Sequence, residues 1–407
     1  MPDLDAYRLQ VRAKFAEHMP LRPPGWRLHG PRSDEAVARA RHLQDTLANN
    51  GLAGITWPVE YGGQGLTPAH EQIVHEESAP YEMPRYFGST LQKIARTIII
   101  HGTEEQKRDH LENMLHGREL WAQFLSEPGS GSDLAGSTTR AELRGDSWVL
   151  NGSKIWTTSG HYADFAICLA RTDWDLPKHQ GLSMFIVPVH SPGLTVVPIR
   201  LAAGTSEFCQ EFLDDVVIPR TNLVGEVNQG WTVARTLLVF ERNAFANEPL
   251  EAAKKQRHGL DAGLLRLARD SGTVDDPRTR DLLVQAHVRD IVDGQLAERI
   301  VTGQATGKIA GPAGSMIKLS VAAASFFHSD VAMEVAGTAA IAAADAVPQL
   351  GLDHVGRQAL AVGGGTNEMQ RNTISERLLG LPREPQNNDV PFRLVKTNAV
   401  VSYGSPS

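Results

Sequence analysis

The hydrophobic pattern of this chain changes its period twice, and that change limits the possible folds more than any other feature. Up to about residue 118 the apolar residues recur at helical spacing, as at Ala36, Ala40, Leu43 and Leu47. From there to about residue 225, short runs with a period of two alternate with Gly, Asp and Pro, and after Trp231 the helical spacing returns. The pattern predicts helices, then an antiparallel sheet or barrel, then a helical bundle.

The length of 407 residues favours two or three domains, at about 150 residues per domain. We therefore expect an α+β multi-domain protein with an N-terminal α-helical domain (1–118), a middle antiparallel β-barrel domain (119–225), a C-terminal helical bundle (226–384) and a tail (385–407). One bundle helix should turn an apolar stripe inward, made of Val284, Val288, Ile291, Val292 and Ile300. The tail has no period, so we expect it either to hang loose or to dock on a neighbour.

The composition excludes several classes of protein. Lys and Arg total 40 against 47 Asp and Glu, a net charge of −7 that argues against a nucleic-acid partner. Two cysteines, Cys168 and Cys209, cannot form a disulfide framework or a four-thiolate zinc site, so we expect a cytoplasmic protein. No stretch reaches the ~18 apolar residues of a membrane span, and the first 15 residues do not resemble a secretory signal.

Three segments have the residue types of a binding site. Residues 121–133 read as a strand that ends in a Gly/Ser loop, whose N–H and hydroxyl donors could hold a large polar ligand. Residues 151–160 place an aromatic ring beside hydroxyl donors, and residues 363–372 form a glycine turn before a helix whose first N–H groups are free. Taken singly, the first is also compatible with an ordinary hairpin turn and the second with a core tryptophan.

Other motifs fail on spacing. His70 and His75 are five residues apart, so on a helix they point in different directions and cannot share a zinc ion; we expect no metal site. The glycines after Gly129 lack the dinucleotide-binding spacing, and the chain has neither a phosphate-binding loop nor the serine elbow of a hydrolase.

With segments 56–63, 216–225 and 374–380, these ordered motifs resemble the acyl-CoA dehydrogenase flavoprotein family over nearly the whole chain. The resemblance implies an α-helical domain, a β-barrel domain and a four-helix bundle. It also implies that FAD lies between barrel and bundle, with the acyl thioester against the flavin ring. Two segments depart from the usual family pattern, one beginning at Arg269 and one ending at Gly337. In both, the chain resembles actinobacterial members, often paired subunits, that oxidise steroid side chains or other bulky CoA thioesters.

The resemblance also assigns cofactor contacts residue by residue. The implied FAD contacts are Leu125, Ser126, Gly131 and Ser132 in the loop, Trp156, Thr157 and Thr158 beside the flavin ring, and Gly337, Thr366 and Glu368 in the bundle. Ser132 would also touch the CoA portion of the substrate. Glu368 stands where many members have Gln. Arg269 is the residue nearest to the arginine with which a neighbouring subunit usually contacts FAD.

The family's reaction needs a carboxylate that removes the α-proton of the thioester. In the commonest members this Glu precedes a Gly-Thr pair, where this chain has Gly364. Isovaleryl-type and several steroid-degrading members instead carry it eleven residues after the Gly of a Gly-aromatic pair. Gly230 leads by that count to Glu241, which the resemblance assigns as the base, with Arg242 in the substrate pocket. Read without the family, Glu241 would be a solvated helix residue. The N–H of Gly364 would contact the thioester oxygen.

The resemblance implies FAD-dependent oxidation of a branched, cyclic or otherwise bulky acyl-CoA to the trans-2-enoyl-CoA. An electron-transfer flavoprotein or a similar acceptor would take the electrons. A homo-oligomer (dimer or tetramer), or a heterotetramer with a related subunit, is expected. The alternatives are an acyl-CoA oxidase, an acyl-carrier-protein dehydrogenase, a flavin monooxygenase and a supportive subunit without activity of its own.

Overall fold

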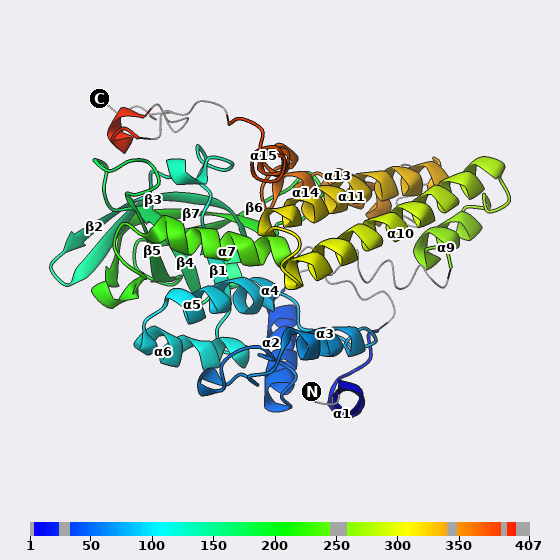
Figure 1. Ribbon diagram of the computed structural model, residues 1–407, viewed down its shortest axis with the longest axis horizontal. Helices are drawn as coiled ribbons and strands as arrows, with labels where there is room; N and C mark the ends of the chain where they lie inside the picture. The colour runs from blue at the N-terminus through cyan, green and yellow to red at the C-terminus, as the bar shows by residue number, and fades with distance from the viewer. Residues whose placement is uncertain are drawn as a thin grey trace. The chain divides into compact units, whose positions relative to one another are not determined.

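Helices come first along the chain, as the spacing predicts (Figure 1). The computed structural model describes residues 4–23, 33–244, 259–338, 340, 348–383 and 389–395. The first helices are α1 (Leu4–His18), α2 (Asp34–Asn49), α3 (Pro68–Glu77), α4 (Phe87–Ser89), a π-turn at Thr90–Ala95, α5 (Arg96–His101) and α6 (Glu104–Leu115). Ser33 caps α2 by accepting the N–H of Ala36, and the buried face of α2 includes the predicted Ala40, Leu43 and Leu47.

The middle of the chain forms one eight-stranded sheet in the order β6-β7-β3-β2-β4-β5-β8, with β1 paired to β4. The strands are β1 (Trp121–Phe124), β2 (Arg140–Arg144), β3 (Ser147–Thr158), β4 (Phe165–Arg171), β5 (Leu182–Pro188), β6 (Leu194–Ile199), β7 (Phe208–Pro219) and β8 (Leu223–Val224). Five described pairings are antiparallel, as expected, but β4 pairs in parallel with β1 and, at one residue, with β2. The β2–β3 hairpin lies between β1 and β4 in sequence and supplies the long connection that a parallel pair requires.

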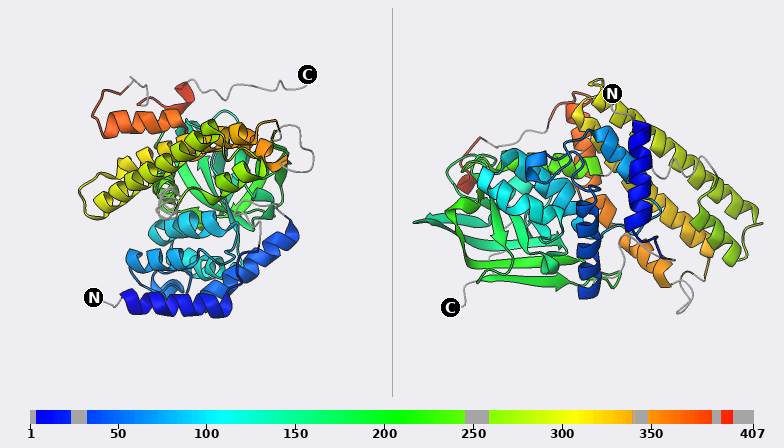
Figure 2. Two further views of the ribbon diagram at one scale, coloured as in Figure 1. Left: turned by 90° about the vertical axis from the view of Figure 1, so that its right-hand side faces the viewer. Right: turned by 90° about the horizontal axis from the view of Figure 1, so that it is seen from below.

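Both faces of the central strands are buried. On β4, Ile167 and Leu169 join a core shared with the N-terminal helices, whereas Ala166, Cys168 and Ala170 point into a second core on the other face. This alternation explains why β4 and β5 read as continuous apolar runs rather than as polar–apolar alternation. Blue-to-cyan helices cover one side of the green strands in Figure 2. The N-terminal helices, the sheet and residues 206–238 belong to one compact unit, together with the described tail residues 389–395.

The second compact unit comprises residues 201–205 and 239–386. Helix α7 (Gly230–Ala244) runs from the first unit into the second, which then contains α9 (Ala262–Asp270), α10 (Pro277–Ala305), α11 (Gly314–Ala336), α13 (Pro348–Gly356), α14 (Ala359–Val362) and α15 (Asn367–Arg377). The start of α10 packs on the end of α11 through Leu283 and Val335, and Ile300 near the end of α10 packs near Ile317. Helices α10 and α11 therefore form an antiparallel pair (Figure 1). Across the described residues, no helix combines the length and apolarity required to cross a bilayer.

The predicted apolar stripe of α10 is wrong for its three valines, whereas Ile300 is buried. Val284, Val288 and Val292 are 51–53% exposed. The buried face of α10 is instead made of Leu282, Leu283, Ala286, Ala297 and Ile300. The exposed valines lie on the opposite side of the helix. Periodicity finds both stripes, but it cannot tell which one faces the unit's own core.

Candidate functional site

A tight turn begins the Gly/Ser loop of the first unit. Glu127 and Ser130 exchange two backbone hydrogen bonds of 3.0 Å. The hydroxyl of Ser130 points inward and donates to the carbonyl oxygen of Asp133, whereas Gly131 and Ser132 are exposed. The N–H groups of Gly131 and Ser132 donate to no residue that the structure describes. The predicted donors of this loop are therefore available to a ligand.

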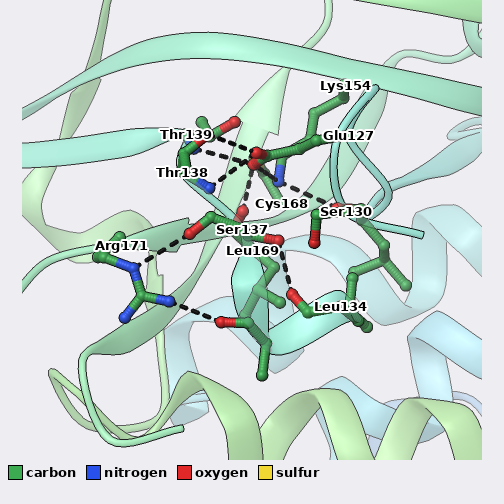
Figure 3. Close-up of polar contacts among 12 residues, drawn as sticks. Glu127, Ser130, Leu134, Ser137, Thr138, Thr139, Lys154, Cys168, Leu169 and Arg171 are labelled. Carbon is green, nitrogen blue, oxygen red and sulfur yellow. Dashed lines mark hydrogen bonds and ion pairs between the residues drawn. The ribbon is translucent and has the colours of Figure 1, made fainter. Parts of the chain in front are cut away.

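A buried ion pair holds the base of this loop (Figure 3). The Glu127 carboxylate accepts the N–H groups of Thr138 and Thr139 at 2.7 and 2.9 Å, and the Nζ of Lys154 at 2.8 Å. Lys154 is 0% exposed and also donates to the Leu125 carbonyl at 3.1 Å. Burial alone would raise the pKa of Glu127, but the charge and hydrogen bonds of Lys154 outweigh it and lower this pKa to about 2. The pair therefore fixes Leu125, one of the predicted FAD contacts.

Arg171 holds the far end of the same loop. Its buried guanidinium donates to the carbonyl oxygens of Ser137 at 3.0 Å and Ala135 at 2.7 Å (Figure 3). Burial lowers the pKa of Arg171 to about 10, against the opposing effect of nearby carboxylates. Because Glu127 accepts N–H groups and Arg171 donates to carbonyl groups of one segment, residues 127–139 are held at both ends.

A β-bulge turns Trp156 outward. Ile155 pairs with Gln210 and Thr157 with Cys209, so Trp156 is the extra residue of β3. Its φ of 67° is unusual for a non-glycine residue, and its side chain is 54% exposed. Thr158 is exposed as well, whereas Thr157 is buried. The bulge thus presents an aromatic ring and a hydroxyl on the surface of the first unit.

Thr157 faces a buried acid, Glu211, that the sequence analysis did not single out. The Oγ1 of Thr157 lies 2.8 Å from Oε2 of Glu211 and 3.3 Å from the carbonyl oxygen of Gln123. The hydroxyl of Thr157 donates to the nearer acceptor, Oε2 of Glu211, and this hydrogen bond opposes the rise in the pKa of Glu211. Glu211 is 0% exposed, and burial raises its pKa to about 8.

The second unit contains the predicted base. Glu241 lies half-buried near the end of α7, and the side chain of its predicted neighbour in the substrate pocket, Arg242, lies outside the described residues. The fully buried Lys318 of α11 donates to the carbonyl oxygen of Leu360 in α14. Burial lowers the pKa of Lys318, and the charge of Glu241 opposes this shift. The two side chains are therefore close enough to interact electrostatically.

The glycine turn follows α14 directly. Gly364 and Gly365 have φ of 69° and 89°, and the buried Gln370 amide donates to both of their carbonyl oxygens at 3.1 and 3.0 Å. Thr366 caps α15 by accepting the N–H of Met369. The N–H of Gly364 donates to no residue among those described.

Three other bundle residues from the sequence analysis lie at helix ends. Glu368 is in the first turn of α15, largely exposed and 3.6 Å from Arg371. Gly337 ends α11 with a φ of 58°. Arg269 is exposed in the last turn of α9. The FAD contacts of Glu368 and Gly337 stay predictions, and whether Arg269 replaces the usual arginine of the neighbouring subunit stays open.

Comparison with known proteins identifies the fold and its chemistry together. The acyl-CoA dehydrogenase N-terminal, middle and C-terminal domains match residues 2–118, 122–216 and 228–379. The acyl-CoA dehydrogenase IpdE1 of Mycobacterium tuberculosis is 35% identical over 94% of this chain and 99% of its own length. These matches define an FAD-dependent oxidoreductase. The chain belongs to the acyl-CoA dehydrogenase family, so the resemblance, the fold class and the enzyme class are confirmed.

Two solved structures have the same fold. One, described as the Tcur3481-Tcur3483 steroid ACAD, superposes with a TM-score of 0.77 at 27% identity. The other, the ChsE4-ChsE5 complex from Mycobacterium tuberculosis, superposes with a TM-score of 0.70 at 30% identity. Each comparison covers 94% of this chain and 99% of the other.

The cofactor of the family, FAD, fits the described residues. The uncommitted N–H groups of Gly131 and Ser132 suit the polar edge of a large anionic ligand, and the exposed Trp156 ring suits a flat aromatic group. The sequence analysis missed the buried charges beneath these contacts. Glu127 and Lys154 lie inside two of the quoted motifs, so their signal was present, but neither was assigned a role.

We predict that the free energy of unfolding of the parent falls as the pH rises toward 8, and that Glu211→Gln abolishes this fall. A raised pKa means that folded Glu211 keeps a proton that the unfolded chain releases, so the free energy of unfolding falls as the pH rises from the ordinary value of 4.5 to about 8. The amide stays neutral, so the variant should be more stable than the parent at pH 8, by on the order of 4 kcal/mol at most, and similar at pH 4.5.

Urea denaturation at pH 4.5, 6.5 and 8 measures this difference. Glu142→Gln, at an exposed carboxylate of the same sheet, is the control and should show no such trend. Identical pH dependence in the parent and in Glu211→Gln would mean that Glu211 is ionised throughout the range.

Proposed function

We propose that this chain oxidises an acyl-CoA thioester to the trans-2-enoyl-CoA, with Glu241 as the base. The carboxylate of Glu241 removes the α-proton, and the C–H electron pair becomes the new α,β double bond as the β-hydride departs. FAD, when bound, accepts that hydride. The observation that carries the proposal is Lys318, which interacts with both Glu241 and the backbone just before the glycine turn.

Lys318 suits the needs of a base that works beside an apolar acyl chain. An isolated carboxylate in such surroundings takes up a proton, because burial disfavours its charged form. Lys318 is a buried ammonium group, and its electrostatic interaction with Glu241 means that an opposite charge lies near the proposed base. The same ammonium group donates to Leu360, so one residue supports the base and also the segment that leads into Gly363–Gly365.

Gly364 supplies the second element of the reaction. Removal of the α-proton places negative charge on the thioester oxygen, which then needs a donor already directed at it. The N–H of Gly364 has no acceptor among the described residues, and Gln370 holds the turn in place.

The substrate in this proposal is a branched, cyclic or otherwise bulky acyl-CoA. Gly364, beside which the thioester would lie in this proposal, has no side chain, and one structural relative is described as a steroid ACAD. The proposal includes an electron-transfer flavoprotein, or a similar protein, as acceptor. Both cysteines are buried thiols that form no disulfide, which suits a reducing cytoplasm.

The proposed enzyme is an oligomer, either with itself or with a related subunit as in the ChsE4-ChsE5 complex. The supporting observation is α10, which has apolar residues on two opposite sides. Val284, Val288 and Val292 form one exposed side. Because three aliphatic side chains on one side of a helix form an exposed apolar surface, we infer that a second chain covers these valines.

The first prediction is that Glu241→Gln loses ~10²-fold or more in the rate of flavin reduction, the scale of general-base effects, while it still binds FAD and thioester. Anaerobic bleaching of the flavin after mixing with a panel of acyl-CoA thioesters measures this rate. Glu334→Gln, at an exposed ion pair of α11, is the matched control and should reduce at the parent rate. If Glu241→Gln reduces the flavin at nearly the parent rate, another carboxylate is the base.

The second prediction is that Gly364→Ala loses ~10-fold more kcat/KM with bulky thioesters than with linear ones, because its methyl group enters the acyl space. An alanine at a φ of 69° is also strained. Since that strain is the same for every substrate, the comparison between substrates within one variant removes it. An equal loss on both classes would contradict a bulky substrate.

The third prediction is that Val288→Asp weakens the oligomer without unfolding the chain, because it buries a charge in the expected contact. Sedimentation velocity at several concentrations should give smaller particles, with unchanged far-ultraviolet circular dichroism. Val59→Asp places the same charge on a more accessible valine of the first unit, 70% exposed against 52% for Val288, and should have no effect. If Val288→Asp assembles like the parent, α10 is not part of the interface between chains.

A further inference from the structure

The described part of the C-terminal tail docks on the chain's own β4–β5 loop. Phe392 and Arg393 donate their N–H groups to the carbonyl oxygens of Leu176 and Trp174, at 3.0 and 3.1 Å. Pro391 forms a bridge with Pro177. Residues 389–395, which we call the strap, are therefore held in place by the loop at residues 172–181. The loop and the strap belong to the same compact unit.

The side chain of Phe392 covers the buried charge of Arg171. Its ring centroid lies 3.4 Å from Cζ of Arg171 and 5.6 Å from the ring centroid of Trp174, and Phe392 is 2% exposed. Every hydrogen bond from the guanidinium to a described residue goes to a carbonyl group, and none goes to a carboxylate. The negative face of the Phe392 ring therefore supplies part of the stabilisation that a counter-ion would otherwise give.

Arg171 transmits this contact to the predicted ligand loop. Its guanidinium donates to the carbonyl oxygens of Ala135 and Ser137, beside the Thr138–Thr139 backbone that Glu127 holds, and to the carbonyl oxygen of Lys178. Lys178 in turn reaches Asp133 at 2.6 Å. One connection thus runs from the strapped loop through Lys178 directly to Asp133, and a second runs through Arg171 to Ala135 and Ser137. Both hold the loop in which the N–H groups of Gly131 and Ser132 have no partner among the described residues.

We propose that Phe392 is a positioning residue, and that the strap, through Arg171 and Lys178, keeps the Gly131–Ser132 donors in place for the thioester and FAD. This proposal rests on the proposed function for the identity of the ligand. It assigns a role to a C-terminal segment that contributes no side chain to the reaction itself. Loss of the ring should leave the chemistry unchanged and weaken the binding that prepares it.

The test compares three full-length variants. Phe392→Ala removes the ring, Phe392→Tyr keeps it, and Leu394→Ala changes a 67% exposed residue of the same strap. Hydrogen exchange followed by mass spectrometry, without added thioester, should show faster exchange at residues 127–139 and 172–181 in Phe392→Ala alone. Exchange in α10 and α11 should be unchanged.

Binding and turnover complete the test. Phe392→Ala should raise the KM for the acyl-CoA and the Kd for FAD by ~10-fold, the scale of a desolvated contact between a cation and a ring, with kcat within ~2-fold of the parent. Phe392→Tyr should restore both values, and Leu394→Ala should match the parent.

The possible results separate the two proposals. Faster exchange spread evenly over the chain, or a parent-like exchange pattern in Phe392→Ala, would contradict the proposed role of the strap. If no thioester reduces the parent enzyme, the proposed function fails, but the hydrogen exchange and the Kd for FAD still decide the role of Phe392. A fall in kcat with unchanged KM and Kd would also overturn the proposal, because the ring would then act on the reaction rather than on binding.

Discussion

The ion pair between Glu127 and Lys154 is the interaction on which the site of the first unit depends. A buried pair of charges adds stability only when nearly all of its hydrogen-bonding capacity is used. Here the carboxylate receives two backbone N–H groups, the hydroxyl of Thr138 and the ammonium group. A hydrophobic pair could fill the same volume. It could not hold the Leu125 carbonyl and the Thr138–Thr139 backbone in one geometry, so the pair is best understood as a positioning device.

The two charges that act on residues 127–139 use the two polarities of the peptide group. Glu127 accepts N–H groups of this segment and Arg171 donates to its carbonyl groups. The segment therefore cannot shift toward either side chain without losing hydrogen bonds to the other. A loop rich in Gly and Ser would otherwise sample many conformations, because glycine has few steric restraints. Fixing its ends with buried charges leaves Gly131 and Ser132 free of internal bonds and still ordered.

The sequence predicted the order of helices and strands because side-chain period reports directly on local structure. The predicted stripe of α10 failed because period shows that a helix has an apolar side without showing what covers it. Val288 and Ile300 both fit a helical stripe, yet one is 52% exposed and the other 2%. The parallel pairing of β1 with β4 also depends on contacts distant in sequence, which no local pattern records.

Polar core residues are harder still to predict, and for a physical reason. Glu211 and Lys154 are adjacent across strands β7 and β3, but only the pairing register makes them neighbours. Whether such a carboxyl group is ionised then depends on the other charges nearby. Lys154 bonds to Glu127 at 2.8 Å and, against the effect of burial, the pKa of Glu127 falls to about 2, whereas burial raises the pKa of Glu211 to about 8 although the charge of Lys154 opposes this rise. One ammonium group thus acts on both carboxyl groups, but it forms its hydrogen bond with Glu127, and the two pKa values shift in opposite directions.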